Sequence, residues 1–138
     1  MTEPRVSYLV GRLDRIVRRR LAAALERHGL SLQEYTTLSV LRARSGLSNA
    51  QLARRSLVTP QAMNEVLGRL ERRGLVRRHA DPAHGRVRPA ELTAGGKRLL
   101  SRADGGVDAA EDELFGGVDR NRLRTLLTAA LRGIDGAS

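Results

Sequence analysis

The sequence of 138 residues contains no cysteine and no tryptophan, and aromatic residues make up only 2% of it. The absence of cysteine excludes disulfide bonds, iron–sulfur clusters, thiolate zinc sites and thiol chemistry. Apolar runs are short, and none approaches the roughly 20 residues that a membrane-spanning helix needs. The N-terminal segment carries charges among its apolar positions, so we expect no secretory signal and a cytoplasmic protein.

Lysine is almost absent as well, because Lys97 is the only lysine among the 25 basic residues. With 15 acidic residues the formal net charge is +10, distributed as +5 over residues 1–53, +6 over 54–88 and −1 over 89–138. Positive charge concentrated before residue 89 is typical of a surface that faces a polyanion. A basic face kept only for solubility is the alternative.

Apolar residues at spacings of three and four predict an amphipathic helix near each end of the chain. The first covers residues 6–25 and is stopped by Gly29. The last is capped by Asp119, and its apolar face consists of Leu123, Leu126, Leu127, Ala130, Leu131 and Ile134. Another long helix opens at Thr93, and the pair Gly105-Gly106 predicts a kink or a weak spot in it.

Between these helices the sequence predicts a helix-turn-helix followed by a hairpin. Ser31 and Glu34 have the capping-box spacing of a helix start, and a short helix follows Ser48. Thr59-Pro60 opens the next helix after a tight turn, with Met63, Val66, Leu67 and Leu70 on its inner face. Residues 75–79 and 86–92 then predict two strands around a turn at 81–85. The expected fold is mainly α with a small β-hairpin wing.

The winged-helix pattern predicts which residues contact DNA. The helix after Thr59 is narrow enough for the major groove, and its outward residues near the N-terminus face base edges. Arginines on neighbouring elements suit phosphates, and one at the hairpin tip suits a minor groove. The candidate DNA-binding residues are Thr59, Pro60, Gln61, Asn64 and Glu65 on the helix, Arg54, Arg55, Arg69 and Arg77 for phosphates, and Arg86 in the wing.

Three short motifs occur together in this region. They are the run RLERRGLVRR from Arg69 to Arg78, the wing pattern of Asp81, Pro82, Gly85 and Arg86, and the pattern of Leu92, Thr93 and Gly96. Together they resemble the MarR family (multiple antibiotic resistance regulators), and the flanking helices extend the resemblance over nearly the whole chain.

The resemblance implies a homodimeric repressor that binds a palindromic operator. A small-molecule effector is expected to release the repressor from that operator. The resemblance also implies one MarR-like domain over residues 1–138, with dimerisation helices at 1–30 and 94–138 and a winged-helix lobe at 31–93. The wing departs from the family pattern at His84, because family members usually have an acidic residue two positions before the wing arginine, here Arg86. The recognition helix departs from it at Glu65, where many members have a basic or neutral residue. The helices that the family places around its ligand pocket supply Leu13, Val17, Leu21, Tyr35, Leu38, Leu99 and Ala103.

Other functions have less support in the sequence. A sequence-indifferent architectural protein that binds double-stranded DNA is the main alternative, because arginine charge alone gives non-specific affinity. His28, His79 and His84 do not lie beside an obvious nucleophile, so we expect no enzyme. His79, Asp81 and His84 are close in sequence, but without cysteine or an evident fourth ligand we expect no metal site, and we expect no cofactor.

Overall fold

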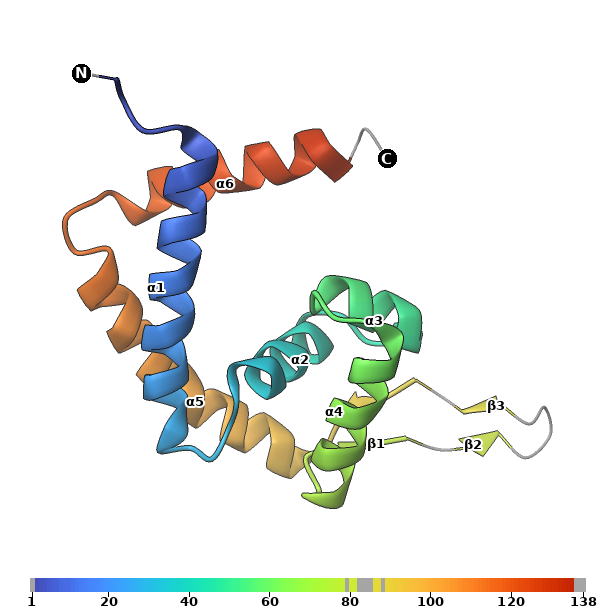
Figure 1. Cartoon of the computed structure of the whole chain (residues 1–138). Coiled ribbons are helices and arrows are strands. Elements are labelled where there is room, and N and C mark those ends of the chain that lie inside the picture. Colours follow the sequence, from blue (N-terminus) through green and yellow to red (C-terminus); the bar gives the residue numbers. More distant parts are fainter. Residues whose placement is uncertain (1, 79, 82–85, 88, 136–138) are drawn as a thin grey trace.

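The computed structural model describes residues 2–78, 80–81, 86–87 and 89–135. Within them the chain forms helices and short strands in the order α1 (Val6–Glu26), α2 (Leu32–Ala43), α3 (Asn49–Arg55), α4 (Pro60–Arg72), β1 (Val76–Arg77), β2 (Ala80–Asp81), β3 (Arg86–Val87), β4 (Glu91–Leu92), α5 (Ala94–Leu114) and α6 (Arg120–Asp135). Helices α1 and α5 pack together on one side, and the strands project from the opposite side beside α4 (Figure 1). This is the mainly helical fold with a small wing that the sequence predicts.

Local capping accounts for the helix starts in the winged-helix lobe. The Ser31 hydroxyl accepts a hydrogen bond from the Glu34 amide at 3.0 Å, and the Glu34 carboxylate accepts one from the Ser31 amide at 2.9 Å. The Thr59 hydroxyl accepts from the Ala62 amide at 3.1 Å, and Pro60 occupies the first helical position of α4. These bonds satisfy amides that a helix N-terminus leaves unpaired.

The wing differs from the two continuous strands that the sequence predicts. Strand β1 pairs antiparallel with β4, and β2 pairs antiparallel with β3, as two separate short ladders. The Arg78 amide donates to the Glu71 carboxylate at 3.3 Å, and Pro89 has no amide hydrogen to donate. The chain between β3 and β4 is also one residue longer than that between β1 and β2, which shifts the register as a bulge does.

Helix α5 is joined to the wing by a close backbone contact. The Thr93 hydroxyl donates to the Gly74 carbonyl at 2.6 Å and accepts from the Gly96 amide at 3.0 Å. A Cβ on Gly96 would lie 2.1 Å from the Leu75 carbonyl oxygen, so only glycine fits there. The Leu92, Thr93 and Gly96 pattern therefore fixes the start of α5 against the end of α4.

A single cluster of buried side chains connects the lobe to the long helices. Its members come from the end of α1, from α2 to α4, from the β1–β4 ladder and from the first part of α5; the largest fully buried ones include Leu25, Leu38, Leu52, Met63, Leu67, Leu70 and Leu100. Helix α5 continues through Gly105-Gly106, so this pair does not end the helix. A Cβ on Gly106 would lie 3.4 Å from the Ala24 carbonyl oxygen, an ordinary contact distance, so α5 lies directly against the end of α1 at this point.

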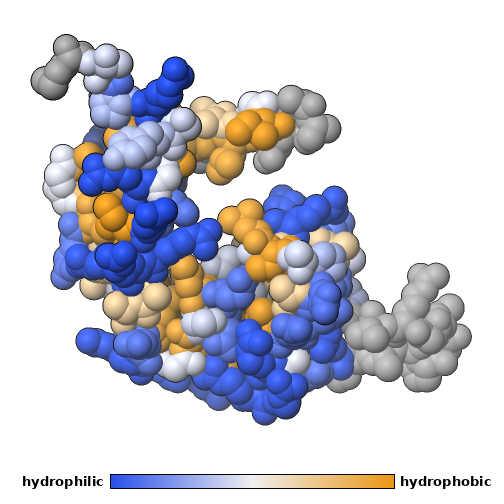
Figure 2. Space-filling model, in the orientation of Figure 1, coloured by the Kyte–Doolittle hydropathy of each residue, from blue (hydrophilic) through white to orange (hydrophobic). Residues whose placement is uncertain are grey.

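Two apolar helix faces are not covered by any of the residues that the structure describes. Large side chains are exposed along α6, namely Leu126, Leu127, Leu131 and Ile134, and along the first half of α1, namely Val6, Tyr8, Leu9, Val10, Leu13 and Ile16. Figure 2 shows apolar surface on α6 facing the lobe across a deep notch. None of the helices in the described ranges is both long and apolar enough to cross a membrane.

Candidate nucleic-acid interface and effector cavity

Helix α4 presents a polar face to solvent opposite its buried stripe. Met63, Val66, Leu67 and Leu70 are buried, as predicted. Gln61, Asn64 and Glu65 are exposed near the capped N-terminus, and in the part of the chain that the structure describes, the side chains of Gln61 and Glu65 make no hydrogen bond or ion pair. Amide side chains of this kind can form paired hydrogen bonds with adenine in the major groove.

The arginines predicted to contact phosphates differ in whether their side chains are exposed or held in an ion pair. Arg54 and Arg55 end α3, and Arg69 lies on α4; all three are exposed. Arg77 is exposed as well, but its guanidinium is 2.8 Å from the Glu91 carboxylate. An ion pair between exposed groups has little net stability, so a phosphate can replace Glu91 at small cost. The backbone of Arg86 belongs to β3, and its side chain lies outside the described part of the structure.

Three further arginines of the RLERRGLVRR run, Arg72, Arg73 and Arg78, were not among the predicted phosphate contacts; the Arg73 guanidinium is 3.4 Å from the Glu34 carboxylate. Arg72 is exposed on the last turn of α4, beside the face that carries Arg69. Arg78 is held by Glu71, whose carboxylate accepts from the Arg78 guanidinium at 3.4 Å and from its amide at 3.3 Å. Arg72 could have been found from its spacing of three residues from Arg69, whereas the Arg78 contact depends on how the chain turns after α4.

A cavity of about 240 Å³ lies where α1 meets the first turn of α2 and the α3–α4 turn. It is lined by Asp14, Val17, Arg18, Leu32, Gln33, Thr36, Ser56 and Leu57. Its walls combine apolar side chains with the Arg18 guanidinium, which is 3.0 Å from Asp14, and with amide and hydroxyl groups. Five of the eight lining residues are polar or charged, so the cavity is more polar than most small-ligand pockets and suits a ligand with polar groups of its own.

Two features of the α3–α4 turn at this cavity are unusual. The Ser56 hydroxyl oxygen is buried and has no hydrogen-bond partner among the described residues. Leu57 has a φ of 62°, in the left-handed region that costs a residue with a Cβ about 1–2 kcal/mol. Its side chain is 79% exposed, so packing does not repay that cost. Such strain tends to occur at ligand sites and switch regions.

The predicted pocket residues are not gathered around this cavity. Val17 lines it, Leu13 is exposed on α1, and Leu38 and Ala103 are fully buried in the core. Leu21, Tyr35 and Leu99 are partly buried and pack against that core. The lining residues that are not in the predicted pocket are Asp14 and Arg18 on α1, Leu32, Gln33 and Thr36 on α2, and Ser56 and Leu57 in the turn. Helical periodicity gives no signal for polar positions or for a turn.

A polar cluster connects α2 to α5 close to the core. The Asp104 carboxylate accepts from the Tyr35 hydroxyl at 2.6 Å and from the Arg42 guanidinium at 2.6 Å. The hydrogen bond from Arg42, and secondarily that from Tyr35, holds the pKa of Asp104 below its ordinary value despite partial burial. Burial, together with Asp104, raises the pKa of Tyr35 to about 12. Tyr35 therefore acts as a donor that fixes the lobe against α5.

The histidines do not form a metal site in the described residues. These contain no group of three or more histidine, aspartate or glutamate side chains that could hold a metal ion. His79 and His84, which the sequence analysis considered as ligands with Asp81, lie outside the described residues. His28 lies beside Gly106, where α1 ends against α5.

Comparison with known proteins identifies the family. The MarR family model matches residues 28–87, from the end of α1 to β3. The HTH-type transcriptional repressor Rv2887 of Mycobacterium tuberculosis is 46% identical over 106 residues, which span 77% of this chain and 76% of that protein. The chain belongs to the MarR family. It is a DNA-binding transcriptional regulator, and its curated relatives are regulators or repressors rather than enzymes.

Solved structures of MarR-family proteins superpose on most of the chain. Rv2887 in complex with DNA has a TM-score of 0.77 and 37% identity, covering 92% of this chain and 98% of that one. Rv2887 in complex with salicylic acid has a TM-score of 0.75 and 38% identity, covering 94% and 96%. CouR from Rhodococcus jostii RHA1, bound to p-coumaroyl-CoA, has a TM-score of 0.81 and 27% identity, covering 94% and 90%.

Proposed function

We propose that this MarR-family regulator is a repressor that binds a palindromic operator with α4 in the major groove. The exposed face of α4 carries the proposal: Gln61, Asn64 and Glu65 stand free at its capped N-terminus. We assign Thr59 and Pro60 to holding that N-terminus, and Arg54, Arg55, Arg69, Arg77 and Arg86 to phosphate and groove contacts. Rv2887, which has been solved in complex with DNA, supports a DNA-binding role for this fold.

The regulator acts as a homodimer in this proposal, with residues 1–30 and 94–138 forming the dimerisation region and 31–93 the DNA-binding lobe. The exposed apolar faces of α1 and α6 need a partner. A hollow of about 780 Å³ separates α6 from the lobe, so the Leu131 side of α6 is open to a second copy. A twofold dimer would set two α4 helices about 34 Å apart, one turn of DNA.

The effector in this proposal is a small aromatic carboxylate that binds the α1–α2 cavity. Rv2887 has been solved with salicylic acid and with p-aminosalicylic acid, and the cavity here suits a single ring in size and composition. Arg18 can pair with the carboxylate in exchange for Asp14. The unpartnered Ser56 hydroxyl supplies a second polar contact.

Selection of genomic DNA fragments by the purified protein at near-physiological salt tests the operator proposal. We expect enrichment of one or a few palindromic sites. Uniform recovery that vanishes as salt rises would replace the repressor with a sequence-indifferent architectural protein. On the enriched site, Asn64→Ala should cost about 1–3 kcal/mol and reduce discrimination against random DNA, whereas Arg69→Ala should weaken both and lower the salt slope by about one.

Calorimetric titration with salicylate tests the effector proposal. Wild type should bind salicylate and lose operator affinity on binding, and Ser56→Ala should bind it more weakly. Equal affinity in the two proteins would remove Ser56 from the site.

We also propose that the protein works in the cytoplasm and has no catalytic role, because DNA is its partner and the cavity's polar groups include no nucleophile–base pair.

A further inference from the structure

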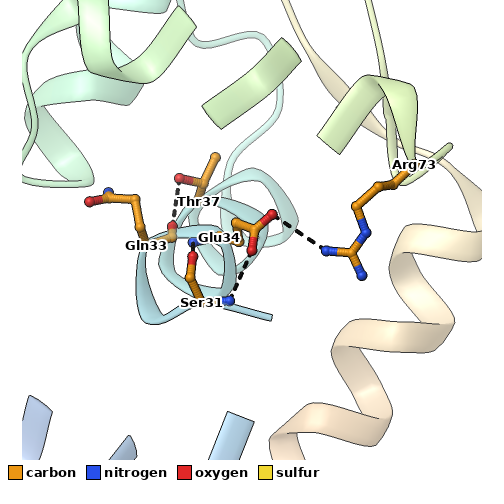
Figure 3. A network of polar contacts seen from close by, with 5 residues as sticks. All are labelled: Ser31, Gln33, Glu34, Thr37 and Arg73. Carbon is orange, nitrogen blue, oxygen red and sulfur yellow. Dashed lines mark hydrogen bonds and ion pairs between the residues drawn. The ribbon is translucent and has the colours of Figure 1, made fainter. Parts of the chain in front are cut away.

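Two adjacent residues in the first turn of α2 contact the segments on either side of the proposed recognition helix, namely the C-cap of α3 before it and the C-cap of α4 at its end. The Gln33 amide donates to the Ser56 carbonyl at 3.4 Å, in the turn that leads into α4. The Glu34 carboxylate is 3.4 Å from the guanidinium of Arg73, which caps the end of α4. Figure 3 shows Gln33 and Glu34 pointing in opposite directions from α2. A short segment of α2 therefore holds the C-cap of α3, four residues before α4 begins, and the C-terminal end of α4 itself.

The contact at the C-terminal end of α4 is the firmer one. Glu34 is 8% exposed, and its other carboxylate oxygen is fixed by the Ser31 amide in the capping box. The Arg73 guanidinium also lies against the α1–α2 turn, since a Cβ on Gly29 would be 3.4 Å from it. A charge-assisted contact between a buried carboxylate and a guanidinium is stronger than a neutral amide–carbonyl bond.

The contact at the N-terminal end is easier to break. It is one neutral hydrogen bond, as long as the Glu34–Arg73 contact but without its charges, and it restrains a turn in which Leu57 has a left-handed backbone. Both of its residues, Gln33 and Ser56, line the α1–α2 cavity, whereas neither Glu34 nor Arg73 does. An occupant of the cavity therefore meets the first contact and leaves the second alone.

We propose that Gln33 is the positioning residue through which occupancy of the cavity reaches the DNA-reading residues. An occupant that displaces the Gln33 amide from Ser56 releases the α3–α4 turn, and α4 pivots about its end at Arg73. Gln61 and Asn64 lie near the released end, so their register with bases is lost first. The proposal rests on the proposed function, and it names the contact that transmits effector binding.

Amide hydrogen exchange on the free full-length protein tests the two contacts without DNA or effector. Gln33→Met keeps the side chain's length and removes its donor, and Glu34→Gln is the matched control that keeps the capping box and removes the charge. We expect Gln33→Met to speed exchange at least threefold at residues 61–63 but not at 73–75, and Glu34→Gln to do the reverse. Equal changes at both ends in either variant would overturn the two-ended arrangement.

Operator release then tests the transmission. Salicylate should weaken operator binding at least tenfold in wild type and in Glu34→Gln, and less than twofold in Gln33→Met. Gln33→Leu, which also removes the donor and adds no charge to the cavity, should behave like Gln33→Met if the methionine variant folds poorly. Full release in both Gln33 variants would overturn the proposal while leaving the proposed function intact.

If wild type does not bind salicylate, the effector proposal fails, and an occupant built into the chain replaces the ligand. Thr36→Phe places a ring in the cavity from α2. It should weaken operator binding at least fivefold in the wild-type background and have no further effect in Gln33→Met. Equal losses in the two backgrounds would show that the cavity acts by another route.

Discussion

Helices α4 and α6 have similar amphipathic sequences and opposite surroundings. The apolar stripe of α4 is almost completely buried, with Met63 and Leu70 at 0% exposure, whereas Leu126 and Leu131 on α6 are about 60% exposed. An apolar stripe thus predicts that a helix needs a partner, but not whether the partner lies in the same chain. For α4 the partners are α2, α3 and β1, and for α6 we propose a second copy.

The largest contrast should come from charges placed in the two stripes. Met63→Asp buries an unpaired carboxylate in the core and should cost more than about 4 kcal/mol of unfolding free energy, enough to unfold the lobe. Leu131→Asp should dissociate the dimer and leave the lobe folded. Circular dichroism and sedimentation measure both. A monomeric but folded Met63→Asp, or an unfolded Leu131→Asp, would contradict the assignment of the two faces.

Tight packing extends from α4 to the start of α5, and adjacent glycines test it. Gly96→Ala forces a Cβ onto the Leu75 carbonyl and should cost about 2–3 kcal/mol. Gly95→Ala meets nothing closer than 3.7 Å and should be neutral or stabilise by about 0.5–1 kcal/mol, because alanine favours a helix. Denaturant unfolding compares them, and equal effects would mean that the close contact at Gly96 is not maintained.

The polar cluster between α2 and α5 should give a smaller, pH-dependent effect. The lowered pKa of Asp104 means that its ionised form stabilises the fold; this contribution is present above the unfolded pKa of about 3.9 and is lost as pH falls through the lower folded value. Asp104→Asn should therefore cost about 1–2 kcal/mol at pH 7. The difference from wild type should shrink below about pH 4.

A matched control for this cluster is the exposed pair of Asp14 and Arg18 on α1. Both side chains are more than half exposed, so Asp14→Asn should change stability by less than about 0.5 kcal/mol. Unfolding free energies measured from pH 3 to 7 compare the two variants. An Asp104→Asn penalty that did not vary with pH would assign the cluster's effect to packing instead of charge.

The smallest expected effect is a gain in stability at the α3–α4 turn. Leu57→Gly removes the strain of a left-handed backbone and little buried surface, so it should raise the unfolding free energy by about 1 kcal/mol. Leu57→Ala keeps the strain and should not. If neither variant differs from wild type in thermal unfolding, the turn does not hold this conformation in solution.

The sequence could predict features that depend on neighbouring residues. The Ser31–Glu34 capping box, the Thr59-Pro60 start of α4 and the buried stripe of α4 are local patterns, and the structure contains all of them. The wing was predicted as continuous strands because the diversion of the Arg78 amide to Glu71 depends on packing of the strand against α4. A pattern along one segment does not reveal a contact between two.

The α1–α2 cavity could not be predicted for the same reason. Gln33 and Thr36 lie on a face of α2 that periodicity marks as solvent-exposed, and Ser56 and Leu57 belong to a turn. Their approach to Val17 depends on how α1 crosses the lobe. The pocket residues taken from the family resemblance fell mostly in the core because they were apolar, whereas the cavity has polar walls.

The shared core has a practical consequence for protein engineering. Leu25 and Leu30, which flank the end of α1, and Leu100, Ala103 and Val107 of α5 belong to the same buried cluster as α4. A segment limited to residues 31–93 would expose that surface, so it is not a cassette that can be transplanted between relatives to exchange operator preference. A chimaera that carries α1 and the first half of α5 along with the lobe would keep the cluster complete.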